Sequence, residues 1–139
     1  MSPEENKAVI LRLYDLINQK QLDAYYELYA PDFIDHASTG DRSLEQMKQF
    51  EAMATAAFPD AKFTVDNMVA EGDKVAFQVH CRMTHKGTFR GVAPTGKKIE
   101  VINTHIVKIV ANKVMEWWGT MDNLGMMQQL GIVSLSGQK

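Results

Sequence analysis

The chain has 139 residues, 45% of them hydrophobic, and a formal net charge of -2 at pH 7, so we expect one compact domain. Acidic and basic residues are mixed, which leaves no basic stripe for nucleic acid. No apolar run is long enough to span a membrane or to form a signal peptide, which predicts a cytoplasmic protein. The single cysteine, Cys81, excludes an intrachain disulfide and a zinc–thiolate site.

Three helices are predicted in the N-terminal half of the chain. A capping box at residues 2–5 begins the first helix, which runs to about Lys20. A short second helix over residues 22–29 ends before a proline. A second capping box, at residues 43–46, begins a third helix that Pro59 ends.

After Pro59 the hydrophobic period changes from helical spacing to alternation, which predicts strands. The strands are expected over residues 63–71, 75–83, 99–110 and 114–120, with a further short strand over 84–90, a turn at 93–96 and a last short helix over 123–130. Helices followed by an antiparallel meander predict an α+β domain with helices on one face of a curved sheet. We expect this single domain to cover residues 1–133, followed by a polar tail over 134–139.

Metal binding and nucleophilic catalysis receive little support from the residue pattern. The four histidines, His36, His80, His85 and His105, form no i,i+4 pair, so we expect no metal. No Gly-rich phosphate loop follows a strand, so we expect no nucleotide cofactor either. Cys81 shares its strand face with apolar residues, which is typical of a buried, unreactive thiol.

General acid–base chemistry is the better-supported hypothesis. Trp118, Thr120 and Asp122 have the same parity and line one face of a regular strand. A carboxylate beside an indole in apolar surroundings is partly desolvated, which raises its pKa and suits it to carry protons. His105, on the neighbouring strand with Asn103 of like parity, is the candidate second group.

Each of these residues also has a structural interpretation. Asp122 stands where the last helix begins, and Asp is a favoured N-cap; accepting backbone N–H bonds would lower its pKa. The pattern alone favours this capping role. His105 fits a buried histidine that is satisfied by a neighbour. Asp35 and His36 form either a dyad at the edge of a pocket or part of a polar loop.

An ordered set of short segments carries a resemblance to a known family. These segments are residues 33–36 (FIDH), 57–60 (AFPD), 71–75 (EGDKV), 87–89 (GTF), 91–97 (GVAPTGK), 116–118 (EWW), Asp122 and 128–131 (QQLG). From about Lys7 to Gly131 the chain resembles the SnoaL-like polyketide cyclases, also labelled ester cyclases, of the nuclear transport factor 2-like superfamily.

The resemblance implies a cone-shaped α+β barrel, in which a curved antiparallel or mixed sheet wraps around the N-terminal helices and encloses a deep apolar cavity. In the characterised cyclases a carboxylate in a Trp-x-x-x-Asp segment is the general acid–base of an intramolecular aldol closure that uses no metal or cofactor. The matching segment here runs from Trp118 to Asp122, so the resemblance favours catalysis by Asp122. A pocket histidine is also implied, and we assign His105 to it.

The resulting functional hypothesis is a cofactor-independent cyclase that acts on a small hydrophobic carbonyl compound. The alternative is a protein that binds such a compound in the same cavity without turnover. The residues expected to line the cavity are Tyr14, Phe33, His36, Phe50, Met53, Asn103 and Trp118. Because Ile102 and Ile106 occupy the opposite face of their strand, we expect that face to be covered in a homodimer or higher homo-oligomer.

Overall fold

The computed structural model describes residues 2–133, and the predicted polar tail at 134–139 lies outside this range. The elements, in chain order, are α1 (Pro3–Asn18), α2 (Leu22–Glu27), β1 (Tyr29–Ala37), β2 (Gly40–Ser43), α3 (Leu44–Ala57), β3 (Lys62–Glu71), β4 (Lys74–Thr84), β5 (Lys98–Val110), β6 (Lys113–Thr120) and α4 (Asn123–Gln129). Within the described range, no helix is both long and apolar enough to cross a membrane.

Both predicted capping boxes are confirmed. Ser2 Oγ accepts the Glu5 N–H at 3.1 Å, and the Ser2 N–H donates to Glu5 Oε1 at 3.0 Å. Ser43 and Gln46 make the same two bonds at 3.2 and 2.9 Å. These bonds satisfy backbone donors that the first turn of each helix leaves free, which fixes where α1 and α3 begin.

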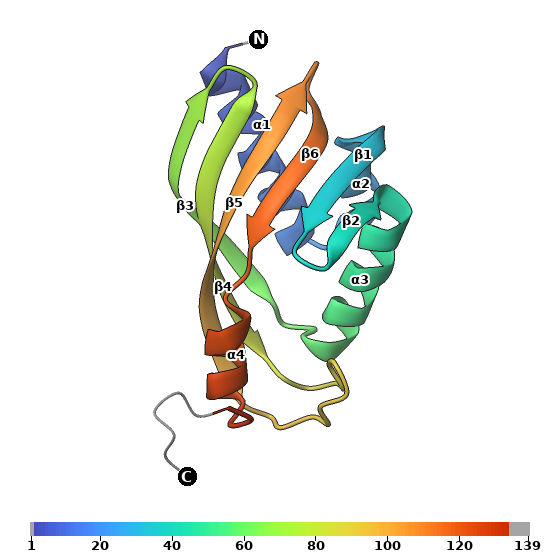
Figure 1. The fold of residues 1–139 in the computed structure, drawn as a ribbon, viewed down its shortest axis with the longest axis vertical. Helices are drawn as coiled ribbons and strands as arrows, with labels where there is room; N and C mark the ends of the chain where they lie inside the picture. Colours follow the sequence, from blue (N-terminus) through green and yellow to red (C-terminus); the bar gives the residue numbers. More distant parts are fainter. Residues whose placement is uncertain (1, 134–139) are drawn as a thin grey trace.

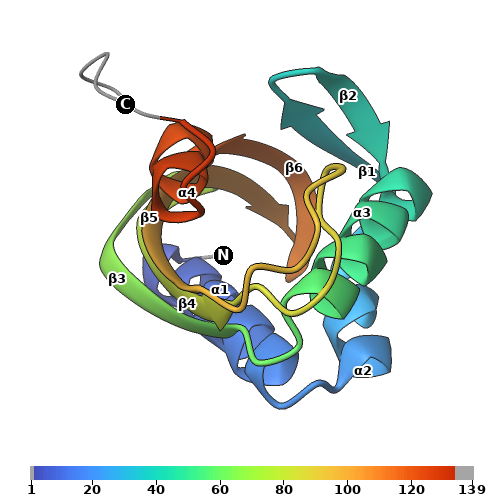
Figure 2. The same ribbon diagram turned by 90° about the horizontal axis from the view of Figure 1, so that it is seen from below.

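The six strands form one mixed sheet with the order β2-β1-β6-β5-β4-β3. β1 runs parallel to β6, and every other neighbouring pair is antiparallel. The sheet curves strongly but does not close, and α1 and α3 lie on its concave side (Figures 1 and 2). This arrangement confirms the predicted α+β fold, a cone in which a curved sheet wraps around helices.

Two parts of the predicted element order are wrong. β1 and β2 occupy residues 29–37 and 40–43, where the sequence predicted no strand, and the helix expected to reach residue 29 ends at Glu27. The partner that makes β1 a strand is β6, about 80 residues further along the chain, so local sequence carries little of this signal. The short strand expected over residues 84–90 is absent; residues 85–97 form an irregular segment that contains one Phe89–Val92 bridge.

Alternation along the central strands separates the concave interior from the outer face. On β5 the buried side chains are Ile99, Val101, Asn103, His105, Val107 and Ile109. The residues between them point outward, and Ile102 and Ile106 remain 52% and 44% exposed. Cys81 on β4 is buried as predicted, and burial raises the pKa of its thiol to about 11, which keeps it protonated at neutral pH.

Candidate active site

His105 lies on the concave face of β5 and is only 8% exposed. Its ring centroid lies 5.6 Å from that of Phe77 on β4 and 5.2 Å from that of Trp117 on β6. Burial lowers the pKa of His105 to about 4, because the apolar surroundings disfavour the charged imidazolium. The imidazole is therefore neutral at physiological pH.

A hydrogen bond from Trp117 fixes the tautomer of this neutral imidazole. Trp117 Nε1 donates to His105 Nδ1 at 3.0 Å. An indole N–H only donates, so Nδ1 of His105 is the acceptor and the ring proton resides on Nε2. No partner for Nε2 occurs within residues 2–133. The site thus presents one N–H donor that is available to a ligand oxygen.

Gly119 provides the space in which this pair forms. It is the β6 partner of His105 in the ladder. A Cβ atom at this position would lie 2.5 Å from His105 Nδ1 and 3.2 Å from Trp117 Nε1. Any side chain at residue 119 would therefore displace the imidazole or the indole.

A β-bulge decides which tryptophan enters the interior. Ile109 pairs with Val114, but Lys108 pairs with Glu116, so Met115 is an extra residue on β6 without a partner in the ladder. A regular ladder from the same two-residue turn would have placed Trp118 opposite His105. Because side chains alternate between faces, the extra residue turns Trp117 inward and Trp118 outward. The predicted inward orientation of Trp118 is therefore wrong.

Trp118 and His36 instead form a cluster on the outer face. Their rings stack with centroids 5.0 Å apart and planes at 13°. His36 Nε2 lies 3.0 Å from Glu116 Oε1, and Nδ1 lies 3.0 Å from Asp41 Oδ1. The bond to Glu116, with that to Asp41, raises the pKa of His36. His36 was expected to line the cavity, but the sheet separates it from His105.

Asp122 is the N-cap of α4, as the pattern alone favoured. Its Oδ1 accepts the Gly125 N–H at 2.8 Å, and its side chain is exposed. A Cβ at Gly125 would lie 2.2 Å from Asp122 Oδ2, so this glycine makes room for the cap. The partly desolvated position beside an indole that we expected for Asp122 does not occur, because Trp118 faces the other way.

Asn103 connects Asp122 to the interior. It is buried on the same face of β5 as His105, two residues away, which is about 7 Å along a strand. Its Oδ1 accepts the Asp122 N–H at 2.9 Å, and its Nδ2 lies 3.6 Å from Cys81 Sγ. The beginning of α4 is thereby fixed to the strand that carries His105.

The remaining predicted lining residues divide between the interior and the surface. Phe33 is buried, and the Tyr14 ring packs on Phe77 with centroids 5.8 Å apart. Phe50 is half-buried beneath the Arg42 guanidinium, which lies 4.6 Å from its ring centroid. Met53 is 57% exposed and does not line the interior, because the inward face of α3 passes through other positions.

Sequence reasoning missed Trp117 and Glu51, and it left Asp35 open between a pocket-edge dyad and a polar loop. Asp35 is buried on β1, where its Oδ2 accepts two hydrogen bonds from Arg42 at 2.6 and 3.1 Å. Nearby, Glu51 on α3 is half-buried and accepts hydrogen bonds from tyrosines. A signal for Glu51 was present, because it lies four residues after Met47 on the apolar face of the predicted helix.

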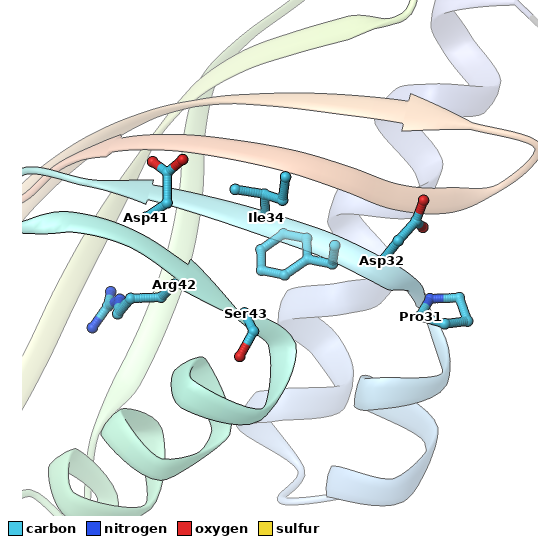
Figure 3. Close-up of a pocket in the computed structure, with 7 residues that line it drawn as sticks. Pro31, Asp32, Ile34, Asp41, Arg42 and Ser43 are labelled. Atoms are coloured by element: carbon cyan, nitrogen blue, oxygen red, sulfur yellow. The ribbon is translucent and has the colours of Figure 1, made fainter.

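Open depressions on the surface of residues 2–133 include two beside strands of the sheet. One, of about 330 Å³, lies beside the β1–β2 hairpin, where Figure 3 shows Asp41 and Arg42 directed to opposite sides of β2. The other, of about 290 Å³, lies near the ends of β4 and β5. Neither is lined by His105 or Trp117, so the deep cavity implied by the resemblance is not one of them. Within residues 2–133, no three His, Cys, Asp or Glu side chains converge as a metal site requires.

Comparison with known proteins identifies the family. Among solved structures, the chain is similar to IdmH, a proposed polyketide cyclase from Streptomyces antibioticus, with 31% identity and a TM-score of 0.81 over 91% of this chain and 98% of that one. It is also similar to AclR, a proposed hydroxylase from Streptomyces galilaeus, with 28% identity and a TM-score of 0.89 over 96% of this chain and 100% of that one.

A third similar structure is a proposed SnoaL-like polyketide cyclase from Jannaschia sp. CCS1, with 26% identity and a TM-score of 0.83 over 96% of this chain and 98% of that one. A comparison with curated proteins gave no match. The family model for SnoaL-like polyketide cyclases matches residues 7–130. The chain therefore belongs to the SnoaL-like polyketide cyclase family.

Proposed function

We propose that this protein is a cofactor-independent cyclase that closes a ring by intramolecular aldol addition within a hydrophobic carbonyl compound. The observation that carries the proposal is the Trp117–His105 hydrogen bond, which leaves a neutral imidazole with its proton on Nε2 in an apolar interior. Such a donor stabilises negative charge that develops on a carbonyl oxygen. Aromatic side chains, among them Tyr14, Phe33 and Phe77, offer flat walls to a planar ligand.

The proposed reaction uses His105 and Asp122. His105 Nε2–H donates to the ketone oxygen while Asp122 removes a proton from the adjacent carbon, and the electron pair of the broken C–H bond moves to the oxygen as an enolate. The enolate carbon then bonds to a second carbonyl carbon of the same molecule. The alkoxide formed there takes the proton back from Asp122.

The assignment of Asp122 rests on its position and on the family segment that ends at it. The Asp122 backbone N–H donates a hydrogen bond to Asn103 Oδ1, and Asn103 lies on the same interior face of β5 as His105. Oδ1 caps α4, whereas Oδ2 makes no hydrogen bond to residues 2–133 and is the proposed proton acceptor. A carboxylate that both caps and reacts must do so with different oxygens.

Exchange of the α-protons of 1-tetralone in D₂O tests the proposal without knowledge of the natural substrate. We expect the wild type to exchange them faster than buffer, and Asp122→Asn to lose about 10²-fold or more while keeping its melting temperature, because Asn caps about as well as Asp. Asp23→Asn, at an exposed position on α2, is the control. Exchange by Asp122→Asn at the wild-type rate would remove Asp122 from the mechanism.

A binding protein without turnover is the second candidate function. The observation in its favour is that the Asp122 carboxylate is exposed and already caps a helix. This function predicts that 1-tetralone shifts the NMR signals of His105 in the wild type while its α-protons exchange no faster than in buffer. Exchange of these protons faster than in buffer would show that the protein is an enzyme and would contradict the binding function.

We also propose that two copies pair through the outer face of the sheet. The exposed side chains of Ile102 and Ile106 on this face support the proposal, since removing apolar surface from water is favourable. Sedimentation at micromolar concentration should give a dimer, and Ile106→Glu should shift it to monomer. A monomeric wild type under these conditions would contradict the pairing.

A further inference from the structure

Glu51 is a carboxylate on the inward face of α3. Met47 and Ala54 lie on the same side of the helix, at spacings of four and three residues; Met47 is buried and Ala54 packs against the core. Glu51 itself is half-buried, so its side chain is neither fully exposed to solvent nor completely enclosed by protein. The helix thus carries an ionisable group toward an otherwise apolar region.

Tyrosine hydroxyls converge on this carboxylate. Tyr26 donates to Oε1 at 2.7 Å and Tyr25 donates to Oε2 at 2.9 Å. The Tyr29 hydroxyl in turn donates to that of Tyr25 at 2.8 Å. A carboxylate offers about four acceptor positions, so each Glu51 oxygen keeps about one more for a ligand.

No cation forms an ion pair with Glu51 within residues 2–133. The neighbouring guanidinium, Arg42, donates both of its bonds to Asp35 and lies over the Phe50 ring. Burial raises the pKa of Glu51, whereas the two tyrosine bonds and, more weakly, the charge of Arg42 lower it. A glutamine would keep both tyrosine contacts, accepting one bond and donating the other, without burying a charge. The fold does not need the charge, which suggests a functional reason for it.

Tyr14 packs on the His105 side of the interior. The Tyr14 ring packs on Phe77, and Phe77 packs on His105. The pKa of Tyr14 is raised chiefly by burial, and the charge of Glu51 contributes. The interior therefore holds a hydrogen-bond donor at His105 and an acceptor at Glu51, and aromatic rings pack against the donor.

We propose that Glu51, held by Tyr25 and Tyr26, binds a hydroxyl group of the same ligand whose carbonyl oxygen bonds to His105. The ligand class is then a hydrophobic carbonyl compound that carries a hydroxyl group at its far end. The carbonyl part of this inference rests on the proposed function, whereas the hydroxyl part is tested independently of it.

The test uses NMR of protein labelled with ¹³C at the glutamate carboxyls and ¹⁵N in histidine, with Glu51→Gln to assign the Glu51 signal. Three probes are added: phenol, 1-tetralone and 6-hydroxy-1-tetralone. We expect phenol to shift the Glu51 signal, 1-tetralone to shift the His105 signals, and the hydroxytetralone to shift both. Glu51→Gln should weaken binding of 6-hydroxy-1-tetralone about tenfold and leave that of 1-tetralone unchanged, since a charged acceptor is lost.

The outcomes separate the two proposals. If 1-tetralone leaves His105 unmoved, the proposed function fails, and phenol still decides the role of Glu51. If neither phenol nor the hydroxytetralone moves the Glu51 signal in the wild type, the present inference is overturned, whether or not Glu51→Gln folds. A melting temperature of Glu51→Gln well below that of wild type at pH 7 would also overturn it, because the charge would then serve the fold. Glu45→Gln, exposed on the same helix, is the matched control.

Discussion

Trp117 and Trp118 are adjacent in the chain and have opposite surroundings. Trp117 faces the interior, donates a hydrogen bond to His105 and meets Phe77 edge-on, with ring centroids 6.0 Å apart. Trp118 faces outward, stacks on His36 and has the Lys74 ammonium 5.6 Å from its ring centroid. The same residue type therefore sets the tautomer of a buried imidazole on one face and packs against an ionic cluster on the other.

The difference between them comes from one residue of β6. Met115 is the extra residue of the bulge, and it sets the face of every side chain that follows it on the strand. Val114, before the bulge, is fully buried, and a regular strand would turn Glu116 to the same face; the extra residue brings Trp117 there instead. The comparison teaches that the tryptophan in the family's Trp-x-x-x-Asp segment need not be the one that reaches the interior.

Replacing each tryptophan by alanine should give the largest contrast between the two faces. Trp117→Ala should lower the free energy of unfolding by about 3 kcal/mol, because an inward aromatic ring leaves a cavity. Trp118→Ala should lower it by about 1 kcal/mol, because this ring lies on the outer face, where water can occupy the space it leaves. Urea denaturation measures both. Equal losses would mean that the two residues do not occupy opposite faces as described.

Protonation of His105, on the inner face, should make the stability of the protein depend on pH. Its folded pKa of about 4 lies below the ordinary value of 6.5, so the unfolded chain binds a proton first as pH falls. The stability contributed by neutral His105 is complete above pH 6.5 and is lost toward pH 4, by about 2–3 kcal/mol.

His105→Gln, which retains an acceptor for Trp117, should flatten this part of the stability curve. Urea denaturation at pH 7, 5.5 and 4.5 measures the slope for wild type and variant. Parallel curves for the two proteins would show that His105 does not titrate as a buried group.

Gly119→Ala should disturb the inner pair alone. The added methyl group collides with the His105 ring, so we expect a loss of about 2 kcal/mol in the free energy of unfolding. The single-tautomer ¹⁵N spectrum of His105 should also be lost. Thr120→Ala, at the exposed next position, is the control and should retain both. An unchanged spectrum in Gly119→Ala would contradict the close approach of Gly119 to the ring.

The smallest effects are expected where β6 ends and Asp122 begins α4. Asp122→Ala should lower the free energy of unfolding by about 1 kcal/mol through loss of the cap, and Asp122→Asn should change it by only a few tenths. Thermal unfolding measures both. A large loss in the Asn variant would show that the negative charge, and not only the cap, holds the beginning of α4.

Much of the fold followed from local chemistry that the sequence displays. The capping boxes at Ser2 and Ser43 begin α1 and α3, and alternation from Val75 to Cys81 marks the buried face of β4. The same alternation placed Asn103 and His105 together on the inner face of β5. These features depend on hydrogen bonds or on a strand period within a few residues, so each can be recognised from a short segment.

Other features depended on contacts between distant segments. β1 is a strand because β6 pairs with it, and the bulge at Met115 inverts the two tryptophans because the curved sheet must bury one face. The position of Glu51 beside Tyr25 and Tyr26 requires α3 to bring it to side chains that lie 26 and 25 residues away in the chain. By itself, the sequence determined where helices cap and which side chains alternate, since those interactions are local. Only the tertiary structure decided which tryptophan meets His105, because a one-residue change of register exchanges the two faces of a strand.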